Sequence, residues 1–249
     1  MEKANSAARK RDLTQGSVIY KLVMFSLPLI ASFLVMQLYN VADSIIVGNF
    51  VGPDALAAVS VSFPIMMFFN ALFMGVSTGA TVVISQFFGA KDKESLEKSS
   101  TTTFTLTIIV GIIITILGII LSKPLLHLLK TPDNIIDDAT LYLVIIFAGT
   151  LGNLIYAIGS GVLRGLGDSK WPLYFLIFCG VLNVGLNMLF VMAFRMGVAG
   201  VAWATLISQY LSGIFVYYRV NKGDYGIRFS FRIIMLPSDI VIDWIPEGS

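Results

Sequence analysis

The sequence predicts an all-α membrane protein, a bundle of six transmembrane helices, from two observations: six long apolar stretches and an uneven distribution of Lys and Arg between them. Hydrophobic residues make up 56% of the 249 positions and charged residues only 13%, a composition that does not suit a soluble globular domain. Each stretch has the length of about 20 residues needed to cross a hydrocarbon core about 30 Å thick. The runs are continuous rather than alternating, which favours helices over barrel strands. The six stretches are 18–42, 55–88, 101–121, 139–163, 172–194 and 198–218.

Basic residues gather on alternate sides of the predicted spans. The N-terminal segment, the second and fourth connections and the C-terminal segment hold 14 of the 17 Lys and Arg residues, and the other three connections hold 3. Because basic connections stay on the cytoplasmic side, we expect both termini to be cytoplasmic. The pattern predicts an integral membrane protein of a bacterial-type plasma membrane. It divides the chain into a cytoplasmic tail at 1–16, a six-helix membrane lobe at 17–220 and a cytoplasmic, truncated linker or tail at 221–249.

The first three spans carry features that predict bends or ends. Pro28 predicts a bend in the first span, because proline removes one backbone hydrogen bond. The second stretch has 34 residues and would reach roughly 51 Å as a straight helix, so we expect it to tilt, protrude or bend, with Pro64 as one bending point. The third span is expected to close at Ser122-Lys123-Pro124, with a short interfacial turn of helix after it at Leu125 to Lys130.

The last three spans begin at turn and capping residues. Thr131-Pro132-Asp133 is a capped start for the fourth span. The fifth begins near Trp171-Pro172, and a glycine-containing turn at 196–200 leads into the sixth.

Asp43 is the sole acidic residue placed within or at the edge of a predicted span. A carboxylate near mid-membrane costs about 2.5–3.5 kcal/mol on insertion scales, so it marks a functional site by default. Polar residues recur on this span at spacings of three and four and therefore share one helix face. They are Gln37, Asn40 and either Asp43 or Ser44. This polar stripe predicts a cation or proton site at Asp43 beside a wet cavity lined by Gln37 and Asn40. The alternative is that Asp43 merely lies in the outer headgroup zone.

Polar pairs on the fifth and sixth spans could complete such a site. Asn183 and Asn187 are one turn apart, as are Thr205 and Gln209. The asparagine carbonyl oxygens could help Asp43 to bind a cation, with Gln209 in the substrate cavity. The alternative is that these residues only make interhelical hydrogen bonds.

The sequence contains no pattern typical of an enzyme. It has no nucleophile–base pair, Walker motif or metal-ligand spacing. The single cysteine, Cys179, and the single histidine, His127, are interpreted as structural. We therefore expect a protein that is not an enzyme, with no cofactor, no nucleic-acid partner and no metal beyond a possible Na⁺ at Asp43.

Four segments stand out by their order and by their places between the spans. They are Gln37-Leu38-Tyr39-Asn40-Val41-Ala42-Asp43-Ser44-Ile45-Ile46-Val47-Gly48; Gly75-Val76-Ser77-Thr78-Gly79-Ala80 with Gln86-Phe87-Phe88-Gly89-Ala90-Lys91-Asp92; Leu163-Arg164-Gly165-Leu166-Gly167-Asp168-Ser169-Lys170; and Gly197-Val198-Ala199-Gly200-Val201-Ala202-Trp203-Ala204-Thr205. Together these segments resemble the multidrug and toxic compound extrusion (MATE) transporters, within a wider group that includes lipid-linked oligosaccharide flippases. The resemblance runs from about Leu13 to Lys222.

The resemblance implies a secondary antiporter that exports organic cations or other amphiphiles in exchange for H⁺ or Na⁺. In many members the first-helix aspartate, here Asp43, binds the coupling ion with polar groups that match Asn183, Asn187 and Thr205. Many members have aspartate where this chain has Asn187, which puts proton relay between paired acids in doubt.

The family architecture resembles two six-helix bundles in one chain, and this chain supplies the first. The expected partners are therefore an amphiphilic small molecule, the lipid bilayer, and a second copy or a missing C-terminal half. Two alternatives stay open: a non-transporting truncated membrane fragment that needs a partner half, and a flippase for lipid-linked substrates. The near absence of Lys and Arg inside the spans argues against the flippase.

Overall fold

The computed structural model describes residues 18–223 and 227. The predicted tail at 1–16 and most of the predicted tail at 221–249 lie outside the described residues. Within the described part, six helices are long and apolar enough to cross a membrane, which confirms the predicted number of spans and the fold class. The helices, with two π-helical turns η1 and η2, are α2 (Val18–Ile46), η1 (Val47–Val51), α3 (Pro53–Gly89), α4 (Lys93–Leu128), α5 (Ile136–Gly165), α6 (Lys170–Met188), η2 (Leu189–Ala193) and α7 (Gly197–Lys222).

Several helices extend beyond the predicted stretches. α3 runs through Pro64 as one helix of 37 residues, long enough to protrude from a hydrocarbon core of ordinary thickness. The predicted end of the third span at Pro124 is wrong, because α4 continues through Pro124 to Leu128. A proline removes only one helical N–H, and near a helix end that loss does not stop the next turn from forming.

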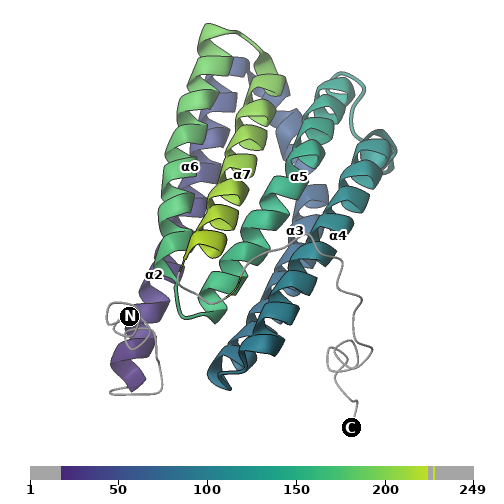
Figure 1. The fold of residues 1–249 in the computed structure, drawn as a ribbon. Coiled ribbons are helices and arrows are strands. Elements are labelled where there is room, and N and C mark those ends of the chain that lie inside the picture. Colours follow the sequence, from purple (N-terminus) through teal and green to yellow (C-terminus); the bar gives the residue numbers. More distant parts are fainter. Residues whose placement is uncertain (1–17, 224–226, 228–249) are drawn as a thin grey trace.

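α5 lies at the centre of the bundle and packs against α3, α4 and α7, while α2 packs mainly on α6 (Figure 1). Small residues allow the close approach of α5 and α7. A Cβ atom on Gly152 would lie 2.8 Å from the backbone N and Cα of Tyr210, and one on Gly213 would lie 2.8 Å from the carbonyl oxygen of Gly152. These glycines let the two backbones touch, as is common between membrane helices.

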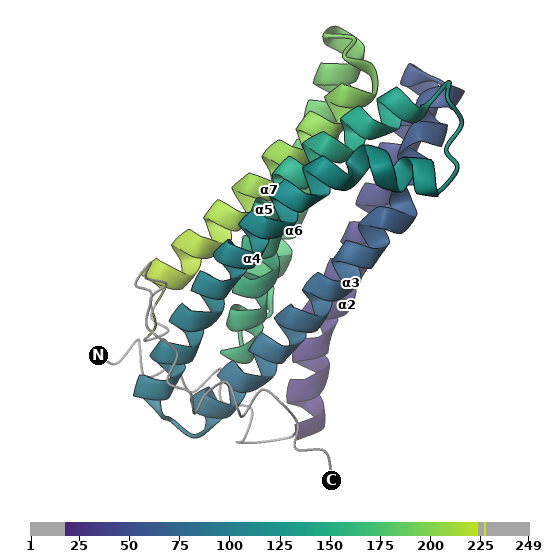
Figure 2. The ribbon, with the colours of Figure 1, turned by 90° about the vertical axis from the view of Figure 1, so that its right-hand side faces the viewer.

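Alternate connections fall at opposite ends of the bundle. The η1, α4–α5 and η2 segments lie at one end, called here the η end, and the α3–α4 and α5–α6 connections lie at the other (Figure 2). At that other end the side chain of Asp92 caps α4 by accepting a hydrogen bond from the Ser95 N–H at 3.1 Å. Hydrogen bonds from the Ser95 side chain and from this N–H hold the pKa of Asp92 below its ordinary value, because they favour the charged carboxylate.

Large apolar side chains remain exposed along the helices, as a membrane protein requires. The most apolar part of α2 contains no buried residue. The side chains of Leu38, Phe68 and Ile120 are all more than half exposed. Such surface is stable against lipid and would drive aggregation in water. The buried core, in contrast, follows α5 through Leu143, Phe147 and Ile158.

Candidate functional site

Asp43 lies on α2, one turn before the π-helical turn η1. Its side chain is partly buried because α2 packs on α6 along this face. Tyr39, one turn earlier, is partly buried on the same face. The first helix therefore presents a carboxylate and a phenol together to the interior of the bundle.

A chain of hydrogen bonds connects Asp43 to α6 and α7. The amide nitrogen of Asn187 donates both to Oδ1 of Asp43 and, at 2.9 Å, to Oδ1 of Asn183. The amide nitrogen of Asn183 donates to Oγ1 of Thr205 at 3.3 Å, and the hydroxyl of Tyr39 reaches the same oxygen at 3.4 Å. The structure thus brings together all four residues of the predicted cation site, from three helices. Their role in binding a cation stays a prediction.

Within the described residues, this cluster leaves the Asp43 carboxylate without a partner cation and one buried amide oxygen without a donor. Asn183 and Asn187 have no exposed surface, and Oδ1 of Asn187 has no hydrogen-bond partner in the described part of the chain. Ion pairs between described residues join Lys98 to Glu94 and Lys123 to Asp137, so neither neutralises Asp43. A poorly solvated carboxylate with no partner cation is costly, and a bound proton or cation would remove that cost.

The donor set determines which ions the cluster can hold. It offers carboxylate, amide and hydroxyl oxygens, which suit hard cations. Within residues 18–223 and 227, no group of three or more His, Cys, Asp or Glu could hold a metal ion. That the cluster holds a proton or Na⁺ stays a prediction.

Sequence reasoning gave Tyr39 no role, and it missed Tyr142. Tyr142 of α5 lies near enough to Asp43 and Tyr39 to interact electrostatically with both. It also packs against the apolar clusters around Val191 and Ala202. The available signal was a phenol inside an apolar stretch, where its hydroxyl needs a polar partner.

The three predicted cavity residues do not contact this cluster in any hydrogen bond between described residues. Gln37 and Asn40 are exposed on α2, and Ser44 shares their face by donating to the carbonyl oxygen of Asn40 at 3.0 Å. Gln209 is partly buried and packs over Gly149 of α5. The sequence left open whether Asp43 or Ser44 shares a face with Gln37 and Asn40. In the structure Ser44 is exposed with them, whereas Asp43 turns toward α6. Their role as cavity residues stays a prediction.

The comparisons with known proteins agree with this arrangement. The family model MatE matches residues 28–189, which include Asp43, Asn183 and Asn187. This chain belongs to the MatE family. Members of this family are transporters rather than enzymes, which confirms the prediction that the chain is not an enzyme.

Individual relatives cover most of this chain and about half of their own length. The probable multidrug resistance protein YpnP of Bacillus subtilis is 38% identical over 207 residues, which are 82% of this chain and 46% of that protein. A crystal structure of a MATE protein in the bent conformation matches with a TM-score of 0.86 at 29% identity, covering 94% of this chain and 52% of that one. An outward-facing multidrug resistance MATE transporter matches with a TM-score of 0.83 at 30% identity, covering 90% and 50%. The chain thus spans about half the length of the relatives it matches. Its six long apolar helices and these transporter relatives show that it is an integral membrane protein.

Proposed function

We propose that this chain forms one lobe of a secondary antiporter that exports organic cations or other amphiphilic compounds in exchange for H⁺ or Na⁺. The observation that carries the proposal is the buried network around Asp43. A single carboxylate hydrogen-bonds to a fully buried asparagine whose own carbonyl oxygen has no partner among the described residues. Packing alone does not require this arrangement, because a leucine would fill the same space without the cost of an orphaned acceptor.

In the proposed mechanism the coupling ion binds between Asp43 and Asn187. A cation there gains the carboxylate charge and the free Oδ1 of Asn187, while Asn183 and Thr205 hold Asn187 in place through their hydrogen bonds. Because Asp43 is on α2 and its partners are on α6 and α7, the ion would tie α2 to the rest of the lobe. Loss of the ion would weaken that connection and so favour movement of α2, as alternating access needs a two-state element.

The substrate cavity and the second lobe are proposed from the polar groups that the bundle leaves uncovered. Gln37 and Asn40 on α2 and Asn70 on α3 are exposed, although all three lie within membrane-spanning helices. Amides are costly against hydrocarbon, so each of these side chains must meet water or protein. A second six-helix lobe, from a second copy or a C-terminal half, would enclose a cavity here. The size of the relatives supports the same inference.

A lipid-linked flippase and a non-transporting fragment remain the alternative functions. Between Gln37 and Ser44 the exposed face of α2 carries amides rather than basic residues, which favours export of cationic or neutral amphiphiles. We also propose a bacterial plasma membrane with both termini cytoplasmic, on the basis of the distribution of basic residues. The η end would then face outward, and cysteines placed at Lys130 but not at Lys91 should react with a membrane-impermeant thiol reagent in intact cells.

The test is dye efflux from proteoliposomes that contain this chain alone, under an imposed pH or sodium gradient. Efflux that follows the gradient in the wild type and in Ser44→Ala, but not in Asp43→Asn, would support the proposal. Ser44 is the matched control because it follows Asp43 directly in α2 but is exposed, whereas the Asp43 side chain turns toward α6. Gradient-driven efflux at the wild-type rate in Asp43→Asn would refute the assignment. Absence of efflux from the folded wild-type chain would refute autonomous transport.

A further inference from the structure

An open pocket lies between the two π-helical turns at the η end, beyond the Asp43 network. Its volume is about 440 Å³. The lining, called here the η pocket, consists of Phe50, Val51, Val191, Met192, Arg195 and Gly197. None of these residues takes part in the hydrogen-bond network of the candidate cation site.

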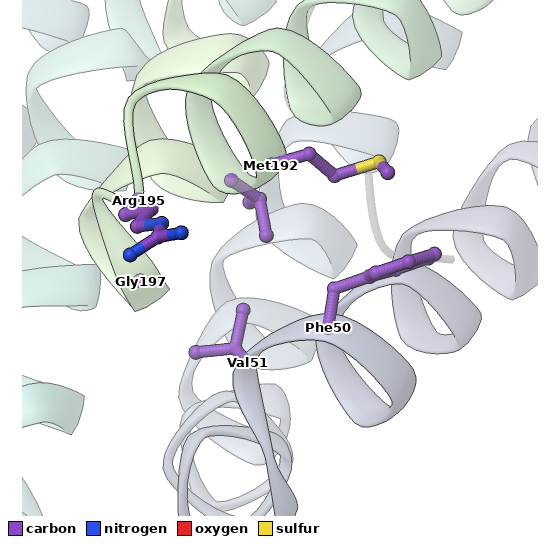
Figure 3. A pocket seen from close by; sticks show the side chains of 6 residues that line it. Phe50, Val51, Met192, Arg195 and Gly197 are labelled. Atoms are coloured by element: carbon purple, nitrogen blue, oxygen red, sulfur yellow. The ribbon is translucent and has the colours of Figure 1, made fainter.

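The lining of the η pocket is polarised. The Arg195 side chain lies at one end, and Phe50 and Met192 extend at the other, with Val51 between them (Figure 3). Arg195 is the one charged residue of the lining. The ion pairs between described residues do not include it. A ligand that complements this pocket carries an anionic group at one end and an apolar body at the other.

The pocket lies at the ends of two membrane-spanning helices. The first and fifth candidate spans end at Val51 and Ala193. Phe50 is 52% exposed and Met192 is 47% exposed, which suits contact with acyl chains. Arg195 follows two residues after the end of the fifth span, and a basic side chain near the end of a span can reach a lipid phosphate.

We propose that the η pocket binds an anionic phospholipid, whose phosphate accepts hydrogen bonds from the Arg195 guanidinium while an acyl chain lies against Phe50 and Met192. An exported organic cation does not fit, because Arg195 would repel it. Free phosphate does not account for the apolar half of the lining. Arginine binds phosphate through a planar fork of donors, so the headgroup would have a defined orientation.

A lipid in this pocket would contact the segments that follow both central residues of the cation site. η1 begins four residues after Asp43, and η2 begins two residues after Asn187. π-helical turns are uncommon and often occur at functional sites. The bound lipid would therefore stabilise the ends of the two helices that carry the coupling-ion site.

The experiment is native mass spectrometry of the whole chain in neutral detergent. Dioleoyl phosphatidylglycerol and dioleoyl phosphatidylcholine, which have the same acyl chains, are added separately. The wild type should retain the anionic lipid preferentially, and Arg195→Gln should lower its affinity at least about tenfold, because a charge-assisted hydrogen bond is lost. Phe50→Ser should weaken both lipids.

Matched controls separate this site from general attraction to the membrane surface. Lys130→Gln removes a basic residue at the same end of the bundle, with a similar left-handed backbone, and Leu128→Ser removes an apolar side chain that is 77% exposed there. Neither residue lines the pocket, so both variants should behave as the wild type. Equal losses in Arg195→Gln and Lys130→Gln would overturn the proposal. So would displacement of the lipid by an equimolar concentration of inorganic phosphate, or unchanged lipid binding in Phe50→Ser.

Discussion

Replacement of Asp43 by asparagine should weaken cation binding about a hundredfold and leave the fold intact. The new amide is almost isosteric, and its oxygen can still accept the hydrogen bond from Asn187. What the variant loses is the negative charge. A monovalent cation about 4 Å from the carboxylate gains about 4 kcal/mol at an effective dielectric constant of about 20. Partial desolvation offsets some of this gain, so we expect a net loss of about 2.7 kcal/mol, which is about a hundredfold in affinity.

This loss translates into a thermal shift. At an ion concentration of about 100 times its dissociation constant, binding stabilises the wild type by about 2.7 kcal/mol, and after a hundredfold loss of affinity the same concentration contributes about 0.4 kcal/mol. For a chain of this size each kcal/mol changes Tm by about 2–4 °C. The ion-dependent shift should fall from about 5–11 °C in the wild type to about 1–2 °C in Asp43→Asn.

The chain carries its own reporter for this assay. Cys179 is the single cysteine and is only 3% exposed, so a thiol-reactive dye would report unfolding. Na⁺ would be exchanged for choline at constant ionic strength, and proton binding would be tested by a parallel pH series. Ser44→Ala should keep the wild-type shift. A wild-type shift in Asp43→Asn, or its loss in Ser44→Ala, would refute the reasoning.

Four further variants test the Asp43 network, the contact between α5 and α7, and the turn at Arg195. Asn187→Ala should lower the free energy of unfolding by about 2–4 kcal/mol, because it removes a buried amide that donates two hydrogen bonds. It should also reduce the ion-dependent shift in Tm. A Tm within 1 °C of the wild type, which corresponds to about a third of a kcal/mol, would contradict this prediction. Gly152→Ala should lower the free energy of unfolding by about 1–2 kcal/mol, since its Cβ would meet the backbone of α7 at 2.8 Å. The control Gly185→Ala places its Cβ in open space and should be neutral or stabilising by up to about 1 kcal/mol. Equal Tm values in the two variants would show that α5 and α7 move apart without cost. Arg195→Gly should raise stability by about 1 kcal/mol in lipid-free detergent, since φ is +52° at this residue; a lower Tm would mean that the arginine side chain stabilises the turn.

The general outline of the fold could be predicted because membrane insertion depends on properties that are local in sequence. A run of about 20 apolar residues crosses a bilayer whatever its neighbours are, so the number of helices followed from six stretches. Boundaries were less predictable, as the continuation of α4 through Pro124 shows. Whether a helix continues past its apolar run depends on capping and packing beyond the membrane, and hydropathy does not report these.

The candidate site was predictable to the extent that it consists of polar residues in apolar stretches. Asp43, Asn183 and Asn187 were identifiable because each is costly in hydrocarbon, and the structure places all three in one network. Tyr142 was not identifiable as a neighbour of Asp43, because nothing in its own stretch shows that α5 passes this point.

The sequence by itself therefore determined the class of protein, the number of its membrane helices and the small set of polar residues that need a partner inside the bilayer. Only the tertiary structure decided that Asp43 rather than Ser44 turns toward α6, that Thr205 receives hydrogen bonds from two other helices, and that the two π-helical turns border one pocket with Arg195 at its end. The physical reason is that the 3.6-residue periodicity of a helix does not decide which of two adjacent residues, such as Asp43 and Ser44, belongs to a given face. The neighbour against which that face packs is determined by side chains far away in the chain.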